Sequence, residues 1–409
     1  MLTFQDKLNN YAELAVKIGA NVQPGQTLVV SAAIDAAELV RLIVKKAYEA
    51  GANLVKVNYT DEVVTRLRYD LAPEESFHIP PTAQAREWTE LAEQNAAFLT
   101  VISSNPDLLK GVSPERIANH QRTFGQAMAK YRQYQQSDKM SWTGVAFPSP
   151  DWAAKVFPDV PKEEQVSKLW DAIFHAVRAD QEDPIGAWHK HIETLQSKSD
   201  ELNHKKYQKL HFTAPGTDLT IELPTGHIWA QAGSVNEQGT TFVANIPTEE
   251  VFTAPLKSGV NGYVTSTKPL SYGGNIIDRF KLTFENGRIV DFHAEEGQDT
   301  LARLIGMDEG SHYLGEVALV PYHSPISQSN ILFLTTLFDE NASCHLAIGS
   351  SYAFNLEGGK TMSAEELAAH GMNASITHVD FMMGSPEMNI TGITHDGKED
   401  PIFVNGNWA

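Results

Sequence analysis

The sequence predicts two domains of different kinds: an N-terminal α/β domain over residues 1–204 and a C-terminal, β-rich α+β domain over residues 205–409. Three observations lead to this prediction. The chain has 409 residues, which is enough for two or three domains. Helical and strand patterns alternate in the first half, as they do in a parallel sheet flanked by helices. Short strand patterns dominate the second half.

Four segments of the first half have the pattern of buried strands. They cover residues 27–33, 53–59, 97–104 and 141–149. An amphipathic helix is predicted from Phe4 to Ile18, and further helices over residues 36–52, 85–94 and 114–134. Strands separated by helices favour a mainly parallel sheet. No GxGxxG or GxxxxGK[ST] motif follows any of these strands, so the sequence offers poor support for a nucleotide site.

The second half changes in character after a polar helical stretch over residues 162–208. Beyond His211 come short runs of alternating apolar and polar residues, which are typical of strands. The clearest is a hairpin over residues 279–294 with turn residues at Asn286 and Gly287. Helical patterns interrupt these runs only at residues 299–307 and 363–371. We therefore expect a β-rich domain here, without internal repeats.

The charge balance limits the possible partners. The 32 Lys and Arg residues against 51 Asp and Glu residues give a net charge of −19, which disfavours binding to nucleic acid or to anionic membranes. Residues 205–409 alone hold 11 basic and 24 acidic side chains. Such an excess is either a solvated surface or a set of groups that bind cations. No membrane span or signal peptide is evident, and a single Cys forms no internal disulfide, so we expect a cytoplasmic protein.

Imidazole side chains coincide with this acidic half, because nine of the 15 His residues lie at or beyond His211. His378 and Asp380 are two apart in a predicted strand, so their side chains leave the same face. His345 lies in an apolar, strand-like run, where a buried imidazole needs a partner. Glu340 and Tyr352 flank that run on either side. Such mixtures of side chains are typical of metal sites.

Two further carboxylate sites complete the set. Glu316 is the only charged residue in an apolar strand, so it should be paired, protonated or bound to a metal. Glu249 and Glu250 are adjacent in an extended segment, so at most one of them points inward, and strand parity alone does not say which. Carboxylates and imidazoles from separate strands are the ligands that a pair of divalent cations about 3.5–4 Å apart requires.

Other catalytic sites fit the sequence less well. It contains neither the HExxH motif of helix-borne zinc peptidases nor the GxSxG motif of serine hydrolases. Cys344 faces away from His345 if the segment is a strand, so a thiol nucleophile is excluded. His189 and His191 are two apart on a predicted helix and cannot share a metal, so we expect both at the surface.

Four segments of the second half then occur in a specific order: IPTEEVFTAP, LGEVALV, FDENASCHLAIGSSY and THVDFMMGS. In this the chain resembles the aminopeptidase T family of dinuclear metallopeptidases, which also includes aminopeptidase S and aminopeptidase II. The likeness extends over nearly the whole chain, including PGQTLVV near the start. It implies an exopeptidase that removes N-terminal residues, with an α/β N-terminal domain, a C-terminal metal-binding domain and a homodimeric state.

The resemblance also implies which residues form the site. The family's metal ligands fall on Glu250, Glu316, His345, His378 and Asp380. Glu316 matches the bridging position, Tyr352 matches a tyrosine at the metal centre, and Glu340 matches an acidic position of the site. We therefore expect two divalent metal ions per chain, and the ligand types accept Zn²⁺, Co²⁺, Mn²⁺ or Mg²⁺.

Together with the ligand types, the resemblance implies a metal-dependent aminopeptidase that acts on peptides with a free N-terminus. We expect Tyr352 to stabilise the developing oxyanion, and Glu249, Glu250 or Glu316 to transfer the proton of the attacking water. Two alternatives stay open. The chain could be a dinuclear hydrolase of another bond, although its acidity disfavours phosphoesters. It could also be a two-domain small-molecule binding protein with structural metal.

Overall fold

The computed structural model describes residues 2–103, 105, 107–273 and 275–409. Contacts divide the chain into two compact units. The first unit comprises Met1–Lys190 and Gly233–Pro247, and the second unit comprises His191–Ala232 and Thr248–Ala409. The domain boundary between residues 204 and 205 stays a prediction. In the described residues, no helix combines the length and the apolar character that crossing a membrane requires.

The first unit contains a five-stranded, fully parallel sheet with the strand order β10-β4-β3-β1-β2. Its strands are β1 (Thr27–Ala33), β2 (Leu54–Thr60), β3 (Ala97–Ile102), β4 (Trp142–Ala146) and β10 (Asn245–Ile246). The first four match the predicted strands, except that residue 104 of the predicted segment 97–104 lies outside the described residues. The prediction of a mainly parallel sheet is therefore confirmed. The fifth strand comes from a segment about 100 residues further along the chain.

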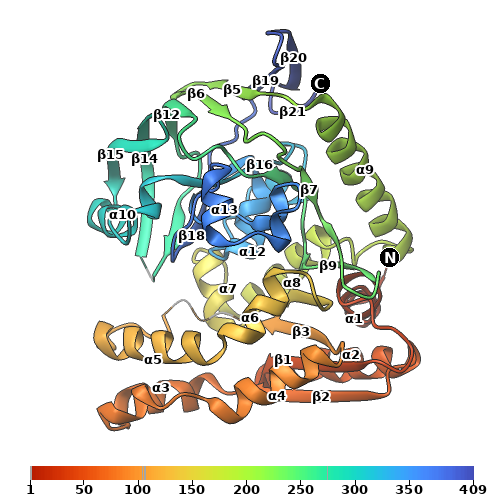
Figure 1. The fold of residues 1–409 in the computed structure, drawn as a ribbon. Coiled ribbons are helices and arrows are strands. Elements are labelled where there is room, and N and C mark those ends of the chain that lie inside the picture. The colour runs from red at the N-terminus through yellow and green to blue at the C-terminus, as the bar shows by residue number, and fades with distance from the viewer. Residues whose placement is uncertain (1, 104, 106, 274) are drawn as a thin grey trace. The chain divides into compact units, whose positions relative to one another are not determined.

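Helices connect these strands and accompany the sheet (Figure 1). They are α1 (Phe4–Leu14), α2 (Ala37–Glu49), α3 (Glu62–Leu71), α4 (Thr82–Glu93), α5 (Pro114–Ala127), α6 (Ala129–Gln136), α7 (Pro150–Val156) and α8 (Lys162–Ala176). A capping box between Thr3 and Asp6 starts α1. The predicted helical stretch over residues 162–208 is interrupted after α8 and resumes as the long helix α9 (Pro184–Lys205). The first unit also holds the strand pair β8 (Gly233–Val235) and β9 (Thr241–Val243).

The second unit is rich in antiparallel strands, as predicted. Its larger sheet has nine strands: β5 (Lys209–Ala214), β6 (Thr217–Glu222), β12 (Val260–Thr265), β13 (Leu270–Tyr272), β14 (Asn275–Glu285), β15 (Arg288–Glu296), β19 (Asn389–Ile393), β20 (Glu399–Val404) and β21 (Asn407–Trp408). The predicted hairpin is formed by β14 and β15. Its turn requires Gly287, which has a φ of +82° and whose Cβ, if present, would lie 1.7 Å from the carbonyl oxygen of Lys257.

The smaller sheet of the second unit has the strand order β18-β17-β16-β11-β7. These strands are β7 (Ala230–Gln231), β11 (Val251–Thr253), β16 (Leu314–Leu319), β17 (His345–Gly349) and β18 (His378–Met382). Besides the end of α9, the described part of this unit contains the short α-helices α10 (Gln298–Ile305), α11 (Pro325–Ser329), α12 (Thr336–Asp339) and α13 (Ala364–Ala369). Every residue of β16 and β17 is buried, so the charged side chains in these strands are removed from water.

One buried hydrogen-bond pair in the first unit offers a test of its packing. The hydroxyl of Tyr11 donates to the carbonyl oxygen of Ala146 (2.9 Å) and accepts from the amide nitrogen of Ala146 (2.7 Å). Tyr11→Phe leaves both backbone groups unsatisfied, so we expect the free energy of unfolding to fall by about 1–3 kcal/mol. Chemical denaturation measures this change. Tyr59→Phe, at a tyrosine that is 45% exposed, should change it by less than about 0.5 kcal/mol, and equal effects would contradict the prediction.

Candidate metal centre

Three adjacent strands of the smaller sheet carry most of the candidate ligands. In the antiparallel register, Ala347 of β17 pairs with Glu316 of β16 on one side and with Asp380 of β18 on the other. Residues that pair directly across an antiparallel sheet point to the same face. The small side chain of Ala347 therefore leaves space between two carboxylates that lie in one row.

Four polar contacts join the side chains on this face. The Nε2 atom of His345 lies 3.0 Å from Oε2 of Glu250 and 3.3 Å from Oε1 of Glu316. The Nε2 atom of His378 lies 3.6 Å from Oε2 of Glu316 and 3.4 Å from Oδ1 of Asp380. The structure thus brings together all five residues to which the resemblance assigns metal ligation. We call these five residues the cluster.

The cluster divides into two groups that could each hold a metal ion. One group is Glu250, Glu316 and His345, and the other is Glu316, His378 and Asp380. In each group, every residue offers one ligand atom, and these atoms lie within 4.8 Å of one another. Glu316 belongs to both groups, and its two oxygens face different imidazoles.

The structure distinguishes the two adjacent carboxylates that strand parity left undecided. Glu250 lies in the cluster, whereas Oε2 of Glu249 lies 3.6 Å from Nε2 of His191. The surface position expected for His191 is wrong: its side chain is 11% exposed, and its Nε2 lies 2.8 Å from the carbonyl oxygen of Thr248. His189 is exposed, as expected.

Tyr352 and Glu340 lie beside the cluster. The ring of Tyr352 is 4.7 Å from the ring of His378, measured between centroids, and it stacks on Phe354 at 5.2 Å. Glu340 follows α12 and is partly buried, and its electrostatic neighbours include Glu250 and Asp380. Both residues therefore face the same group of charges.

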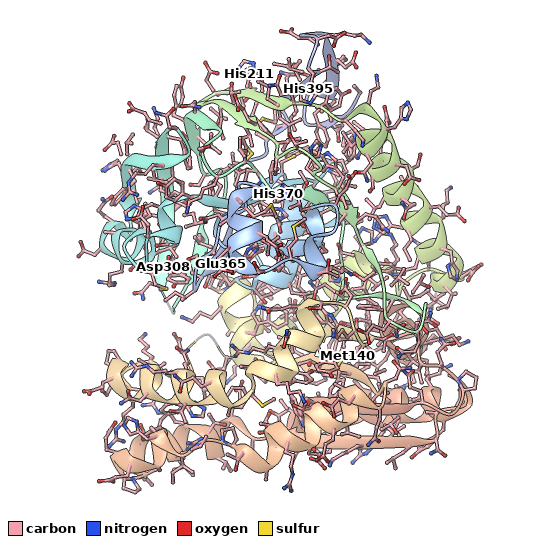
Figure 2. The ribbon with its side chains drawn as sticks, viewed as in Figure 1. Met140, His211, Asp308, Glu365, His370 and His395 are labelled. Carbon is pink, nitrogen blue, oxygen red and sulfur yellow. The ribbon has the colours of Figure 1, made fainter. Side chains whose placement is uncertain are left out.

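Most histidines of the second unit do not contribute to the cluster. Figure 2 labels three of them, His211, His370 and His395. His211 pairs instead with Asp218 at 2.8 Å. The number of His residues in the C-terminal half therefore indicates the cluster less well than the spacing of His378 and Asp380 does.

Burial and like charges shift the proton equilibria of the cluster. Burial, together with the charges of Asp380 and Glu250, raises the pKa of Glu316 to about 7, although His345 opposes this shift. Burial and the neighbouring carboxylates also raise the pKa of Glu340 well above its ordinary value. Burial alone would lower the pKa of His378, but Asp380 and Glu316 raise it to about 10. Without a cation, the cluster therefore retains protons to balance its charge.

The donor set fits divalent cations. Within the described part of the chain, the ion pairs of the cluster carboxylates are all with histidines, so no Lys or Arg neutralises them. Among the same residues, the buried Oδ1 of Asp380 has no hydrogen-bond partner. Nδ1 of His345 lies 3.3 Å from the carbonyl oxygen of Ser343, and Nδ1 of His378 lies 2.7 Å from that of Ser350. A proton held at Nδ1 in this way leaves Nε2 available to a metal.

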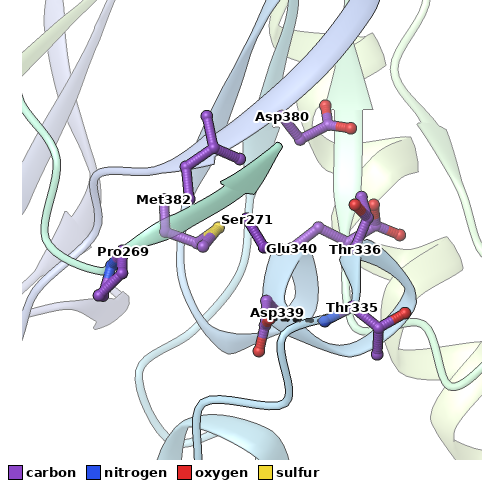
Figure 3. Close-up of a pocket in the computed structure, with 9 residues that line it drawn as sticks. Pro269, Ser271, Thr335, Thr336, Asp339, Glu340, Asp380 and Met382 are labelled. Carbon is purple, nitrogen blue, oxygen red and sulfur yellow. Dashed lines mark hydrogen bonds between the residues drawn. The ribbon is translucent and has the colours of Figure 1, made fainter. Parts of the chain in front are cut away.

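A recess that is partly open to solvent lies beside the cluster (Figure 3). Asp380 of the cluster and the adjacent Glu340 both line it. The other lining residues are Pro269, Leu270, Ser271, Thr335, Thr336, Asp339 and Met382. A molecule in this recess would therefore contact apolar side chains, hydroxyl groups and the acidic residues of the site.

Comparisons with known proteins agree with this chemistry. The family model described as "Thermophilic metalloprotease (M29)" matches residues 4–408. The chain is 61% identical to aminopeptidase AmpS of Bacillus subtilis (strain 168) over all 409 residues, which is 100% of both chains. It is 52% identical to aminopeptidase 2 of Geobacillus stearothermophilus, covering 100% of this chain and 99% of the relative.

A solved structure, that of wild-type AmpT from Thermus thermophilus, is similar over 100% of both chains, with a TM-score of 0.94 and 40% sequence identity. These full-length matches favour an aminopeptidase over a non-catalytic binding protein and over a hydrolase of another bond. The chain belongs to the M29 family of metalloproteases and is a metal-dependent aminopeptidase.

Proposed function

We propose that this aminopeptidase binds two divalent cations in the cluster and cleaves the first peptide bond of peptides that have a free N-terminus. The observation that carries the proposal is the shared position of Glu316, which belongs to both groups of potential ligands. Its Oε1 faces His345 and its Oε2 faces His378. One carboxylate with its two oxygens directed to two separate groups is suited to bridge two ions.

The proposed ligands follow from the two groups. Glu250 and His345 would hold one ion, His378 and Asp380 the other, and Glu316 both. Glu340 is proposed as a further ligand because it is partly buried and lies near the charges of Glu250 and Asp380. Oxygen and imidazole ligands of this kind accept Zn²⁺, Co²⁺, Mn²⁺ or Mg²⁺.

The cations, when bound, polarise the carbonyl of the scissile bond and make water a stronger nucleophile at neutral pH. The proton of the attacking water must then reach the leaving amine. We assign this transfer to Glu250 or Glu316, because both carboxylates face the cluster while Glu249 contacts His191.

Tyr352 is proposed to donate a hydrogen bond to the oxyanion that develops on the substrate carbonyl. Burial and the charges of Glu316 and Asp380 raise the pKa of its phenol well above the ordinary value, so the hydroxyl keeps its proton. Stacking on Phe354 and contact with His378 hold the ring in place. A neutral donor that is already oriented stabilises the transition state without reorganisation.

The recess beside the cluster is proposed to receive the first residue of the substrate. Asp339, Glu340 and Asp380 give it an acidic lining. Such a lining favours a protonated amino terminus over a blocked one. We also propose that the enzyme is a homodimer located in the cytoplasm, which the resemblance of the four motifs and the single Cys residue support, respectively.

The central test is the metal content of the purified protein together with its activity. We expect two ions per chain, and release of free amino acid from an unblocked peptide but not from its N-acetylated form. A chelator should abolish this release, and added Zn²⁺, Co²⁺, Mn²⁺ or Mg²⁺ should restore it. His378→Ala should lower the metal content, while His211→Ala, which removes an imidazole outside the cluster, should not. Unchanged metal content in the first variant would contradict the proposed site.

The role of Tyr352 has its own test. Tyr352→Phe removes only the hydroxyl, so we expect kcat to fall by about 10- to 1000-fold while two ions remain bound. The matched control is Tyr263→Phe, at a partly exposed tyrosine on β12, which should leave kcat unchanged. Full turnover of the Tyr352 variant would exclude an oxyanion-stabilising role.

The pKa shifts predict how pH acts on the metal-free protein. The pKa of Glu316 rises from 4.5 to about 7 on folding, and that of His378 rises from 6.5 to about 10. Glu316 therefore binds more protons in the folded state than in the unfolded state between about pH 4.5 and 7, and His378 does so between about pH 6.5 and 10. The free energy of unfolding should fall as the pH rises from about 5 to 9.

Thermal unfolding in the presence of a chelator, at several pH values, measures this trend. Bound cations replace the protons, so the metal-loaded protein should lose less stability over the same interval. Glu316→Gln should weaken the decline below about pH 7 in the metal-free protein. A melting temperature of the metal-free protein that rises between pH 5 and 9 would contradict the charge balance described for the cluster.

A further inference from the structure

Asn341 follows Glu340 directly, and its side chain is completely buried. Its Oδ1 accepts a hydrogen bond from the backbone nitrogen of Glu249 at 2.7 Å. Its Nδ2 donates to the carbonyl oxygen of Leu337 at 3.2 Å and to Oε1 of Glu340 at 3.4 Å. The oxygen and both hydrogens of the amide therefore have partners, as a buried amide requires.

These bonds join two segments that carry proposed ligands and lie 92 residues apart in the sequence. Residues 248–250 belong to no helix or strand, so Glu250 is not oriented by a strand ladder. Side chains contact the backbone there instead: Asn341 bonds the nitrogen of Glu249, and His191 contacts the carbonyl oxygen of Thr248. The bond from Asn341 thus fixes the backbone one residue before Glu250.

The same amide also acts on Glu340. This carboxylate is partly buried near the charges of Glu250 and Asp380, which repel it. A neutral donor next to it offsets part of that repulsion without adding a charge to the site. Neither an apolar nor an acidic residue at position 341 could accept from Glu249 and donate to Glu340 at once.

The turn that carries Asn341 is itself well anchored. Ser324 donates through its hydroxyl to the carbonyl oxygen of Asn341 at 3.0 Å. The carboxylate of Asp339 accepts from the backbone nitrogens of Phe333 at 2.7 Å and Thr335 at 3.0 Å. The Asn341 amide therefore extends from a fixed support.

We propose that Asn341 is a positioning residue: it holds the Glu250 segment and the Glu340 carboxylate in the arrangement that binds metal. The inference rests on the proposed function, because it assumes that these two carboxylates are ligands. Asn341 itself contacts neither metal nor substrate and acts through Glu250 and Glu340. Replacing a residue that hydrogen-bonds to a metal ligand typically weakens metal affinity by about 10- to 100-fold.

The experiment compares Asn341→Leu and Asn341→Ala with the wild-type chain. Both variants lose the amide, but leucine retains most of the side-chain volume. The metal is removed with a chelator, and Zn²⁺ is titrated back in competition with a chromophoric chelator, so that the dissociation constant of each bound ion is measured without reference to activity. Circular dichroism and the melting temperature establish that each variant is folded.

The matched control is Asn236→Leu in the first unit. Asn236 is also buried, its Nδ2 donates to Ser141 (3.0 Å), and its Oδ1 accepts from the backbone nitrogens of Gln238 (3.0 Å) and Thr240 (2.9 Å). Its replacement should lower the melting temperature as the Asn341 variants do, yet leave Zn²⁺ affinity within about twofold of wild type. This separates a loss of stability from a loss of positioning.

We expect both Asn341 variants to bind at least one Zn²⁺ ion about 10- to 100-fold more weakly than the wild type. A weaker affinity in Asn341→Ala alone would assign the effect to a cavity and overturn the inference, as would wild-type affinity in a folded Asn341→Leu protein. A wild-type chain that binds one ion would overturn the two-ion proposal while leaving the Asn341 comparison decisive. A wild-type chain that binds none would overturn both.

Discussion

The site depends on one buried carboxylate. Glu316 lies in a strand whose residues are all buried, and it faces an imidazole with each of its oxygens. A bare charge in such a place is unstable, so its neighbours must supply protons or cations. The other members of the cluster add to this demand, because Glu250 and Asp380 bring further negative charge, and their ion pairs among the described residues are with His345 and His378. In the proposed function, metal binding is thus a consequence of where the fold places its carboxylates.

The groups around Glu316 leave room for the buried carboxylates and orient the imidazoles toward them. Ala347 lies in register between Glu316 and Asp380, and a larger side chain there would occupy the space between the two carboxylates. The Nδ1 atoms of His345 and His378 contact backbone carbonyls, which directs Nε2 toward the carboxylates. Backbone groups and a small residue thereby orient the proposed ligands without adding charge. Because neutral groups orient these side chains, a strongly acidic site can form inside an apolar sheet.

Some of this organisation could be predicted from local patterns. The period of two places His378 and Asp380 on one face, and Glu316 stands out as a single charge in an apolar strand. The features that sequence reasoning missed depend on contacts between distant segments. The choice between Glu249 and Glu250 could not follow from strand parity, because residues 248–250 form no strand. The two-residue strand β10 pairs with β4 across about 100 residues, and its length is too short to give a pattern. His191 contacts the carbonyl oxygen of Thr248 and is partly buried, and its position on a helix does not indicate this contact.

The cluster also sets a relation between stability and function. Burial, and then the like charges of the neighbouring carboxylates, raise the pKa values of Glu316 and Glu340, so these groups destabilise the folded chain when no cation is bound. A ligand that binds only the folded state stabilises it in proportion to the logarithm of its concentration over its dissociation constant. The carboxylates that destabilise the metal-free chain are therefore the groups through which cations, in the proposed function, would stabilise the folded state. All residues of β16 and β17, which carry Glu316 and His345, are buried, so the apolar packing of these strands offsets part of that cost.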